Sequence, residues 1–267
     1  MTEPTLQAQI DAANAYEALF VPALFGQWAP RVADAAQIQP GQRVLDVGCG
    51  TGVLAREVAS RMGSSGRVAG IDPSPGMVAV AKQLAPTVDW REGLAESLPF
   101  PDQSFDAVVS QFGLMFFTDR RQALREMLRV LVPGGRLVVA VWDSLDRIPA
   151  YASEVTLLER TAGRRAADAL RAPFGLGNRK VLATLLSEAG LASAEITTHH
   201  GTARFPSIRT MVEADLRGWL PVMGVILTED QIGHTLQEAE HALSSYATAD
   251  GRVTFDLSAH LVTVKKP

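Results

Sequence analysis

The stretch that most constrains the fold is residues 43–53, which read RVLDVGCGTGV. Its β-branched and aliphatic residues suit a buried parallel strand, and the segment after it has the apolar spacing of an amphipathic helix. Between them lie an acidic residue, Asp46, and glycines on alternate positions, Gly48, Gly50 and Gly52. A glycine-rich turn there lets a ligand approach the backbone and meet unpaired N–H groups at the helix N-terminus. The stretch therefore predicts a strand–turn–helix unit that binds a small, nucleotide-like molecule.

Two kinds of ligand compete for this turn. Dinucleotide-binding folds require G-x-G-x-x-G, whose third glycine lets the helix pack closely on the strand. Here Val53 takes the sixth position, and the glycines run G-x-G-x-G. The pattern resembles motif I of the class I S-adenosylmethionine (SAM) dependent methyltransferases, in which DVGCGTG is a common form. Roughly residues 40–142 resemble the ubiquinone/menaquinone-biosynthesis, or type 11, branch of that family.

Strand and helix patterns alternate after residue 43, which predicts a parallel sheet covered by helices. Strands are expected near residues 43–48, 67–72, 88–92, 105–110 and 135–142, and helices near 52–62, 74–85, 119–131 and 180–189. Later strands near 193–200 and 253–264 resemble the antiparallel pair that closes a class I methyltransferase sheet. The resemblance thus implies an α/β, Rossmann-like fold with a seven-stranded, mostly parallel sheet, a C-terminal antiparallel hairpin and a helical cap.

These patterns divide the chain into a core and added helices. The SAM-binding core is expected at residues 41–142, continuing at 179–205 and in a final strand within 251–267. Helical insertions at 143–178 and 206–250 are expected to cover the sheet as a cap over the substrate.

An apolar and aromatic series at helical spacing marks residues 1–40. Pro22 and Pro30 are expected to break it into short helices. Two interpretations stay open for this segment: a lid that closes over cofactor and substrate, or a helix packed on the sheet edge.

Composition excludes several classes of partner. A net charge of −4 and a pI near 5.8 give no electrostatic footprint for nucleic acid or an anionic membrane. No apolar run approaches the ~20 residues of a membrane span, and no secretory signal is visible. The single cysteine, Cys49, argues for a cytoplasmic protein and against a thiolate metal site. Homo-oligomerisation stays open.

The three parts of SAM need different groups. Backbone groups of the motif, with Asp46, suit the amino-acid end, although Asp46 also fits a purely structural role in the loop. Asp72 ends the second strand and suits the ribose hydroxyls, with capping of the next helix as the alternative. The cofactor-binding residues expected in these two stretches are Asp46, Gly48, Cys49, Gly50, Thr51, Gly52, Asp72, Pro73 and Met77, the last of which would pack on the adenine.

The adenine contact departs from the family pattern. Related proteins often read G-D-A-E after the third strand, where the Asp meets the adenine amine, whereas this chain reads Gly93-Leu94-Ala95-Glu96. Backbone groups of Leu94 and Ala95 are the remaining candidates for that contact. Gln111, after the fourth strand, is expected beside the methionine arm, and Phe112 is expected either to line the path of the methyl group or to fill the core.

Methyl transfer from a sulfonium is an in-line displacement that needs positioning and at most a general base. The candidates for that base are Tyr16 in the N-terminal segment, His199 or His200 on a predicted strand, and His234 or His241 in the cap. Each is more often structural or exposed. A metal site at His199 and His200 is not expected, since adjacent strand residues point to opposite faces.

The expected function is SAM-dependent methyl transfer to a small, apolar or aromatic molecule, with S-adenosylhomocysteine as product. A SAM-binding protein of the same fold with a non-methylating or sensing role is the alternative, because fold does not imply function. A nicotinamide-linked oxidoreductase is a third reading, against which Val53 counts. The acceptor atom, O, N or C, is not determined by these residues.

Overall fold

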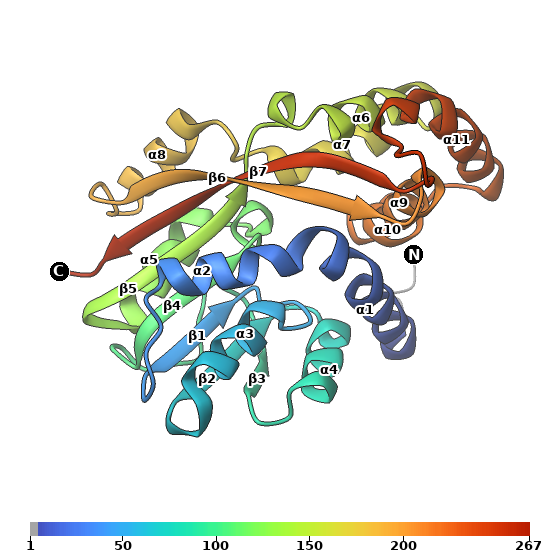
Figure 1. The fold of residues 1–267 in the computed structure, drawn as a ribbon. Helices are drawn as coiled ribbons and strands as arrows, with labels where there is room; N and C mark the ends of the chain where they lie inside the picture. Colours follow the sequence, from blue (N-terminus) through green and yellow to red (C-terminus); the bar gives the residue numbers. More distant parts are fainter. Residues whose placement is uncertain (1–4) are drawn as a thin grey trace.

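A computed structural model of the chain describes residues 5–267. In this range the strands form one sheet of seven, in the order β3-β2-β1-β4-β5-β7-β6 (Figure 1). Strands β1 to β5 run parallel, while β7 is antiparallel to both β5 and β6, so the predicted fold class is confirmed. The strands are β1 (Arg43–Val47), β2 (Arg67–Asp72), β3 (Asp89–Glu92), β4 (Phe105–Gln111), β5 (Leu131–Trp142), β6 (Glu195–Phe205) and β7 (Val253–Lys265).

The position of β1 decides where a ligand can bind. The chain passes outward from β1 through β2 to β3 and then returns to place β4 on the other side of β1. Asp46 at the end of β1 pairs with Gly70 of β2 and with Val109 of β4. A reversal of strand order opens a crevice at the carboxyl ends of the strands, where ligands of such sheets bind. The glycine-rich turn follows β1 at this edge.

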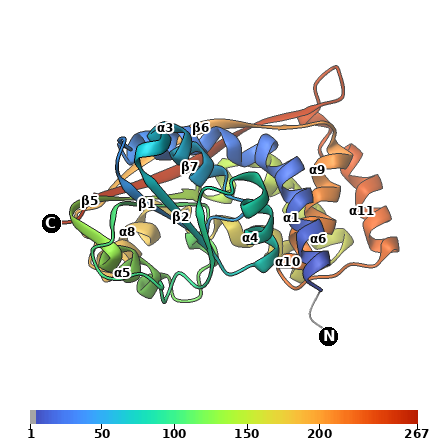
Figure 2. The same ribbon diagram turned by 90° about the horizontal axis from the view of Figure 1, so that it is seen from below.

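Helices cover both faces of the sheet because each has one apolar stripe. In α5, for example, Ala123, Leu124 and Met127 are buried at helical spacing, and Asp119 caps the N-terminus by accepting from the Gln122 N–H at 3.0 Å. Figure 2 shows α3 on one side of the sheet and α5 and α8 on the other. The core helices are α2 (Ala29–Ala35), α3 (Val53–Met62), α4 (Pro75–Leu84), α5 (Arg120–Val130) and α8 (Arg179–Glu188).

The start of β5 differs from the expected position near residue 135. Leu131 already pairs with Phe105, and the ladder then shifts so that Ala107 faces Arg136. The residues between form a bulge inside the strand, which explains why a Pro-Gly-Gly sequence could be mistaken for a helix-terminating turn.

The N-terminal helices also differ from expectation. The chain is helical from α1 (Leu6–Phe20) through a π-helical turn at Val21–Phe25 and a short 3₁₀ turn to α2. Pro22 and Pro30 are the second residues of the π-helical turn and of α2, within the first turn of each, where proline is tolerated. They change the helix type without interrupting the run. Residues 1–4 of the predicted N-terminal segment lie outside the described residues.

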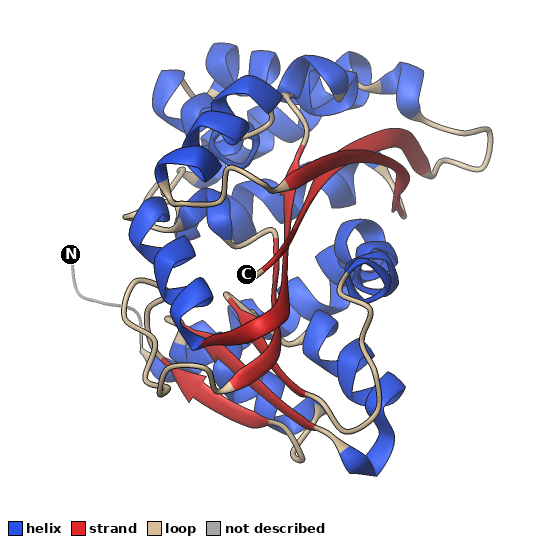
Figure 3. Cartoon of the chain, turned by 90° about the vertical axis from the view of Figure 1, so that its left-hand side faces the viewer, coloured by secondary structure: helices blue, strands red, loops and turns tan. Residues whose placement is uncertain are grey.

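Both predicted insertions are helical. They gather over one end of the molecule, and Figure 3 shows the long β6–β7 hairpin extending from the sheet toward them. Their elements are α6 (Pro149–Thr161), α7 (Arg164–Arg171), α9 (Ile208–Ala214), a π-helical turn (Asp215–Trp219), α10 (Leu220–Val222) and α11 (Glu229–Ala242). No helix within residues 5–267 is long and apolar enough to cross a bilayer.

An ion pair joins Arg43, the first residue of β1, to Asp106, the second residue of β4. Asp106 accepts from the Arg43 backbone N–H at 2.7 Å and from its guanidinium at 2.8 and 3.1 Å, and this side chain lowers the pKa of Asp106. When folding lowers the pKa of a carboxylate, its charged form stabilises the folded state at pH values above the unfolded-state pKa of about 3.9. This stabilisation is lost as the pH falls through the folded-state pKa.

We expect Asp106→Ala to lower the free energy of unfolding by about 1 kcal/mol at pH 7, the usual size for a partly exposed charged bond. Urea unfolding of both proteins at a series of pH values measures this, and the difference should shrink as the pH is lowered below 4. A difference that stays constant with pH would show that lost packing, and not the ion pair, is responsible.

Candidate functional site

The glycine-rich loop folds back on the neighbouring strand. Gly48, Gly50 and Gly52 have φ angles of 69°, 54° and 87°, in the left-handed region that favours glycine. The N–H groups of Gly48 and Cys49 donate to the carbonyl of Ile71 in β2, at 2.8 and 3.1 Å. The loop is therefore held against the end of β2, beside Asp72.

Asp46 lines the cavity, and one of its two carboxyl oxygens has no hydrogen-bond partner in the described chain. Its Oδ2 accepts from the Ala55 N–H in the first turn of α3 at 3.1 Å, whereas its buried Oδ1 has no partner within residues 5–267. Burial raises the pKa of Asp46 to about 8. One oxygen thus performs the structural role expected as an alternative, and the other is left for a ligand that donates a hydrogen bond.

Asp72 lies where β2 meets the same loop. Its two oxygens accept from the N–H groups of Gly50 and Ser74, each at 2.9 Å. Burial raises the pKa of Asp72, and these two bonds oppose the rise. The cap of α4 is Ser74, which accepts from the Met77 N–H at 3.4 Å, so Asp72 does not cap that helix. Its carboxylate is fixed by the backbone and faces the cavity with its remaining lone pairs.

Gln111 and Phe112 close the end of β4. The Gln111 Nε2 donates to the Phe25 carbonyl at 3.2 Å, while its buried Oε1 has no partner in the described chain. Phe112 has a φ of 57°, rare for a non-glycine residue, and its ring stacks on Trp142 with centroids 3.8 Å apart. This conformation turns both side chains into the cavity.

The N-terminal helices contribute one wall. Tyr16 of α1 stacks on Phe25 with ring centroids 5.3 Å apart, and both rings line the cavity with Phe20. Burial, and then the charge of Asp72, raises the pKa of Tyr16 far above its usual value. Because its hydroxyl stays protonated, Tyr16 suits hydrogen bonding and not general-base chemistry.

One arginine ties this wall to the loop. Arg56 of α3 donates to the Thr51 carbonyl and to Glu17 of α1, both at 2.6 Å. Both side chains of the ion pair are mostly buried, with 25% and 22% exposed. The geometry of the glycine-rich loop and the position of α1 therefore depend on the same guanidinium.

We expect Arg56→Ala to speed hydrogen exchange in residues 6–20 and to weaken binding of a ligand in the loop about fivefold, because two charged hydrogen bonds are lost. Exchange mass spectrometry and calorimetry measure the two effects. Arg67→Ala is the matched control, since Arg67 is exposed and its side chain has no bond in the described chain. Equal effects of the two substitutions would contradict the assignment.

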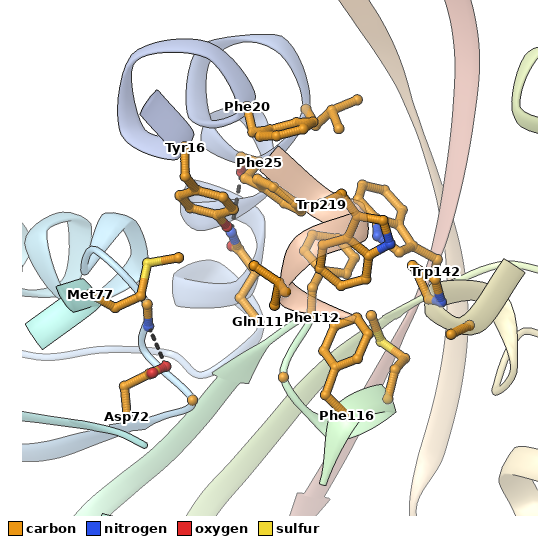
Figure 4. A pocket seen from close by; sticks show the side chains of 18 of the residues that line it. Tyr16, Phe20, Phe25, Asp72, Met77, Gln111, Phe112, Phe116, Trp142 and Trp219 are labelled. Atoms are coloured by element: carbon orange, nitrogen blue, oxygen red, sulfur yellow. Dashed lines mark hydrogen bonds between the residues drawn. The ribbon is translucent and has the colours of Figure 1, made fainter. Parts of the chain in front are cut away.

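A single cavity of about 750 Å³ joins these residues, a size typical of small-molecule sites. Figure 4 shows Asp72 and Met77 at one side of it, Trp142 and Trp219 at the other, and Tyr16 on the wall formed by α1. The predicted site residues that line it are Tyr16, Asp46, Gly48, Cys49, Gly50, Thr51, Asp72, Pro73, Met77, Gln111 and Phe112.

Four predicted cofactor residues are outside this lining. Gly93, Leu94 and Ala95 follow β3, where the Gly93 N–H donates to the Asp72 carbonyl at 3.1 Å. Ala95 is buried, whereas the side chain of Leu94 is exposed to solvent. Gly52, the last glycine of the loop, packs against Trp90, and a Cβ atom added to it would be 2.3 Å from the Trp90 ring. Gly52 thus shapes the loop by packing and does not itself face the cavity.

The histidine candidates do not reach the cavity. His199 interacts with Thr197 at 2.9 Å on β6, and the His200 carbonyl accepts a short bond from Arg31. His234 and His241 are exposed on α11. Of the predicted bases only Tyr16 lines the cavity, and its raised pKa opposes that role. None of the four candidate histidines is part of the cavity lining, so the structure brings no histidine base to the site.

The sequence interpretation missed polar residues that the cap and α5 bring to the cavity. They are Asp215 and Tyr151, with Glu154 behind them, and Arg120, whose Nη2 donates to the Met115 carbonyl at 2.7 Å. The signal was present for Glu154, which lies on the apolar stripe of α6 between Tyr151 and Leu158. Within residues 5–267 no group of His, Cys, Asp and Glu is arranged to hold a metal ion.

Sequence comparison finds relatives for part of the chain. Residues 45–139 match the family described as Methyltransferase domain. Demethylmenaquinone methyltransferase of Renibacterium salmoninarum is 46% identical over 114 residues, 43% of this chain and 47% of that protein. The ubiquinone/menaquinone biosynthesis C-methyltransferase UbiE of Ectopseudomonas mendocina is 43% identical over 118 residues, 42% of this chain and 46% of that protein. The chain thus spans about half the length of the curated relatives it matches.

Structural comparison extends the likeness to most of the chain. The YcgJ protein from Bacillus subtilis superposes with a TM-score of 0.58 at 21% identity, covering 90% of this chain and 98% of that one. This likeness concerns the fold alone. Residues 45–139 thus match a methyltransferase domain and are similar in sequence to ubiquinone and menaquinone methyltransferases, and they contribute strands to the seven-stranded sheet described above.

Proposed function

We propose that the protein is a SAM-dependent methyltransferase that acts on a small, largely apolar or aromatic molecule. The observation that carries this proposal is the single cavity that joins the glycine-rich loop and Asp72 to an aromatic chamber beyond Gln111. One end has the polar groups that a nucleoside-containing cofactor needs, and the other end has the apolar walls that an acceptor ring needs.

Unpaired polar atoms at the first end fit this cofactor. The buried Asp46 Oδ1 and Gln111 Oε1 have no partners in residues 5–267, and both are acceptors suited to an ammonium group. Asp72 is assigned to the ribose hydroxyls, since its oxygens keep lone pairs after accepting two N–H bonds. Met77, which lines the cavity, is assigned to one face of the adenine.

The chain's own residues contribute positioning and exclusion of water. SAM supplies an electrophilic methyl group on a sulfonium. Phe112 and Trp142 form a stacked wall against which an acceptor ring can be aligned for in-line attack. Tyr16 of α1 and Phe25 of the following π-helical turn line the cavity, which supports a lid role for this segment, with Arg56 holding α1 to the loop.

Calorimetric titration with S-adenosylhomocysteine tests the cofactor assignment, and release of that product from SAM in an acceptor screen tests the activity. Micromolar binding together with methylation of apolar aromatic acceptors is the expected result. Binding without methylation of any acceptor would favour the non-methylating alternative. Binding of NADH in place of S-adenosylhomocysteine would overturn the proposal. A cytoplasmic location, for which the single cysteine argues, and a homo-oligomeric state stay predictions.

A further inference from the structure

Two acidic side chains lie together behind the aromatic end of the cavity. Glu154 of α6 is fully buried and Asp215, the first residue of the π-helical turn, is 3% exposed. Neither oxygen of Glu154, nor the Oδ2 of Asp215, has a donor partner in the described chain. A buried polar group without a partner costs about 1–3 kcal/mol, so a pair of them calls for an explanation.

The two carboxyl groups interact with each other. Burial and the neighbouring Asp215 raise the pKa of Glu154 well above its usual value, and burial raises the pKa of Asp215 to about 8. Tyr151, one turn before Glu154, is the other titratable group that faces the pair, and its pKa is raised by burial and by both acids. Glu154 therefore holds a proton that it can donate to Asp215, and no cation within residues 5–267 compensates the pair.

The position of Asp215 argues against a purely structural pair. Asp215 and Tyr151 line the same cavity as Asp72, together with the apolar side chains of Leu170 and Trp219. Trp219, in the same turn as Asp215, lies in Figure 4 on the side away from Asp72. A π-helical turn inside a helical segment is frequent at functional sites. In a purely structural pair, backbone or cationic donors would satisfy the carboxyl oxygens. Here Asp215 instead lines the cavity.

We propose that Asp215 binds a hydrogen-bond-donating head group, hydroxyl or amine, of an otherwise apolar acceptor, and that Glu154 is a positioning residue that holds Asp215 for this contact. This inference rests on the proposed function and specifies its substrate class. The acceptor would have a ring-sized apolar body between Phe112 and Trp219 and an O–H or N–H group directed at Asp215.

Two isosteric series of ligands test the inference in the full chain saturated with S-adenosylhomocysteine. The naphthyl series is 2-ethylnaphthalene, 2-naphthylmethanol and 2-naphthylmethylamine, and the phenyl series is ethylbenzene, benzyl alcohol and benzylamine. In at least one series the alcohol or the amine should bind about tenfold or more tightly than the hydrocarbon, as one hydrogen bond to a buried acceptor that otherwise lacks a partner predicts. Preference for the alcohol assigns a hydroxyl head group, and preference for the amine assigns a cationic one.

Three variants connect that preference to the pair. Asp215→Leu removes the acceptor at similar side-chain size and should remove the preference, whereas Glu154→Gln can still donate to Asp215 and should keep it. Glu159→Gln, an exposed position on the same helix, is the matched control and should behave as the wild type.

The outcomes separate this inference from the proposed function. Equal affinity for hydrocarbon, alcohol and amine, no binding in either series, or a preference that survives Asp215→Leu would each overturn the assignment of Asp215. Normal binding of S-adenosylhomocysteine to the same protein is the control that shows the cofactor end of the cavity to be intact. Failure of S-adenosylhomocysteine to bind the wild type contradicts the proposed function itself.

Discussion

Replacing Gly52 with alanine is expected to lower the free energy of unfolding by about 3 kcal/mol, combining a strained left-handed conformation with overpacking. Gly52 has a φ of 87°, and a Cβ atom built there lies 2.3 Å from the Trp90 ring. Trp90 cannot move away, because its Nε1 donates to the Ala85 carbonyl at 2.8 Å and its ring also covers Gly70. The substitution therefore pushes the loop away from β2.

Thermal unfolding measures this effect, for which a decrease in Tm of about 6–12 °C is expected. Gly190→Ala is the matched control. Gly190 has nearly the same φ, 86°, but no atom within 4 Å of the added Cβ, so it should show only the conformational part, about 1 kcal/mol. If both substitutions cost the same, contact with Trp90 is not what requires glycine at position 52.

Asp72→Ala is expected to weaken binding of S-adenosylhomocysteine by about tenfold to a hundredfold. The substitution removes a charged acceptor for the ribose, and it also releases the N–H groups of Gly50 and Ser74 that the carboxylate holds at 2.9 Å. Asp72→Asn separates the two contributions, because its amide oxygen can hold one N–H group while the charge is lost.

Calorimetry of the three proteins gives the result, with Glu92→Gln as the matched control. Glu92 pairs with Asp72 across the sheet but is exposed and does not line the cavity. Affinity should decrease in the order wild type, Asp72→Asn, Asp72→Ala, and Glu92→Gln should match the wild type. Unchanged affinity in Asp72→Ala would remove Asp72 from the site.

Much of the nucleotide end of the cavity could be predicted from the sequence because its determinants are local. Strand, glycine turn and helix follow each other directly in residues 43–62, and Asp72 ends the next strand. Neighbouring parallel strands have their carboxyl ends at the same edge of the sheet, independently of the rest of the chain. Gly52 was assigned to the cofactor although its constraint comes from Trp90, a contact across strands that spacing does not reveal.

The acceptor end could not be predicted in the same way. Asp215 and Glu154 are 61 positions apart in the chain, and they meet because two separate insertions pack on each other. Helical periodicity predicts which face of each inserted helix is buried, but it does not predict which other helix packs on that face. The histidines were candidates for a general base because of their side-chain chemistry alone. The sequence does not reveal that they are outside the cavity lining.

We expect the double role of Arg56 to link cofactor binding to closure of the proposed lid. Because one guanidinium joins the Thr51 carbonyl and Glu17, a ligand that orders the loop also favours the closed position of α1. Linkage is reciprocal, so a closed lid raises affinity for the ligand by the same factor. Since α1 also covers the aromatic chamber, the cofactor should enter first and leave last, an order that product-inhibition kinetics can read directly.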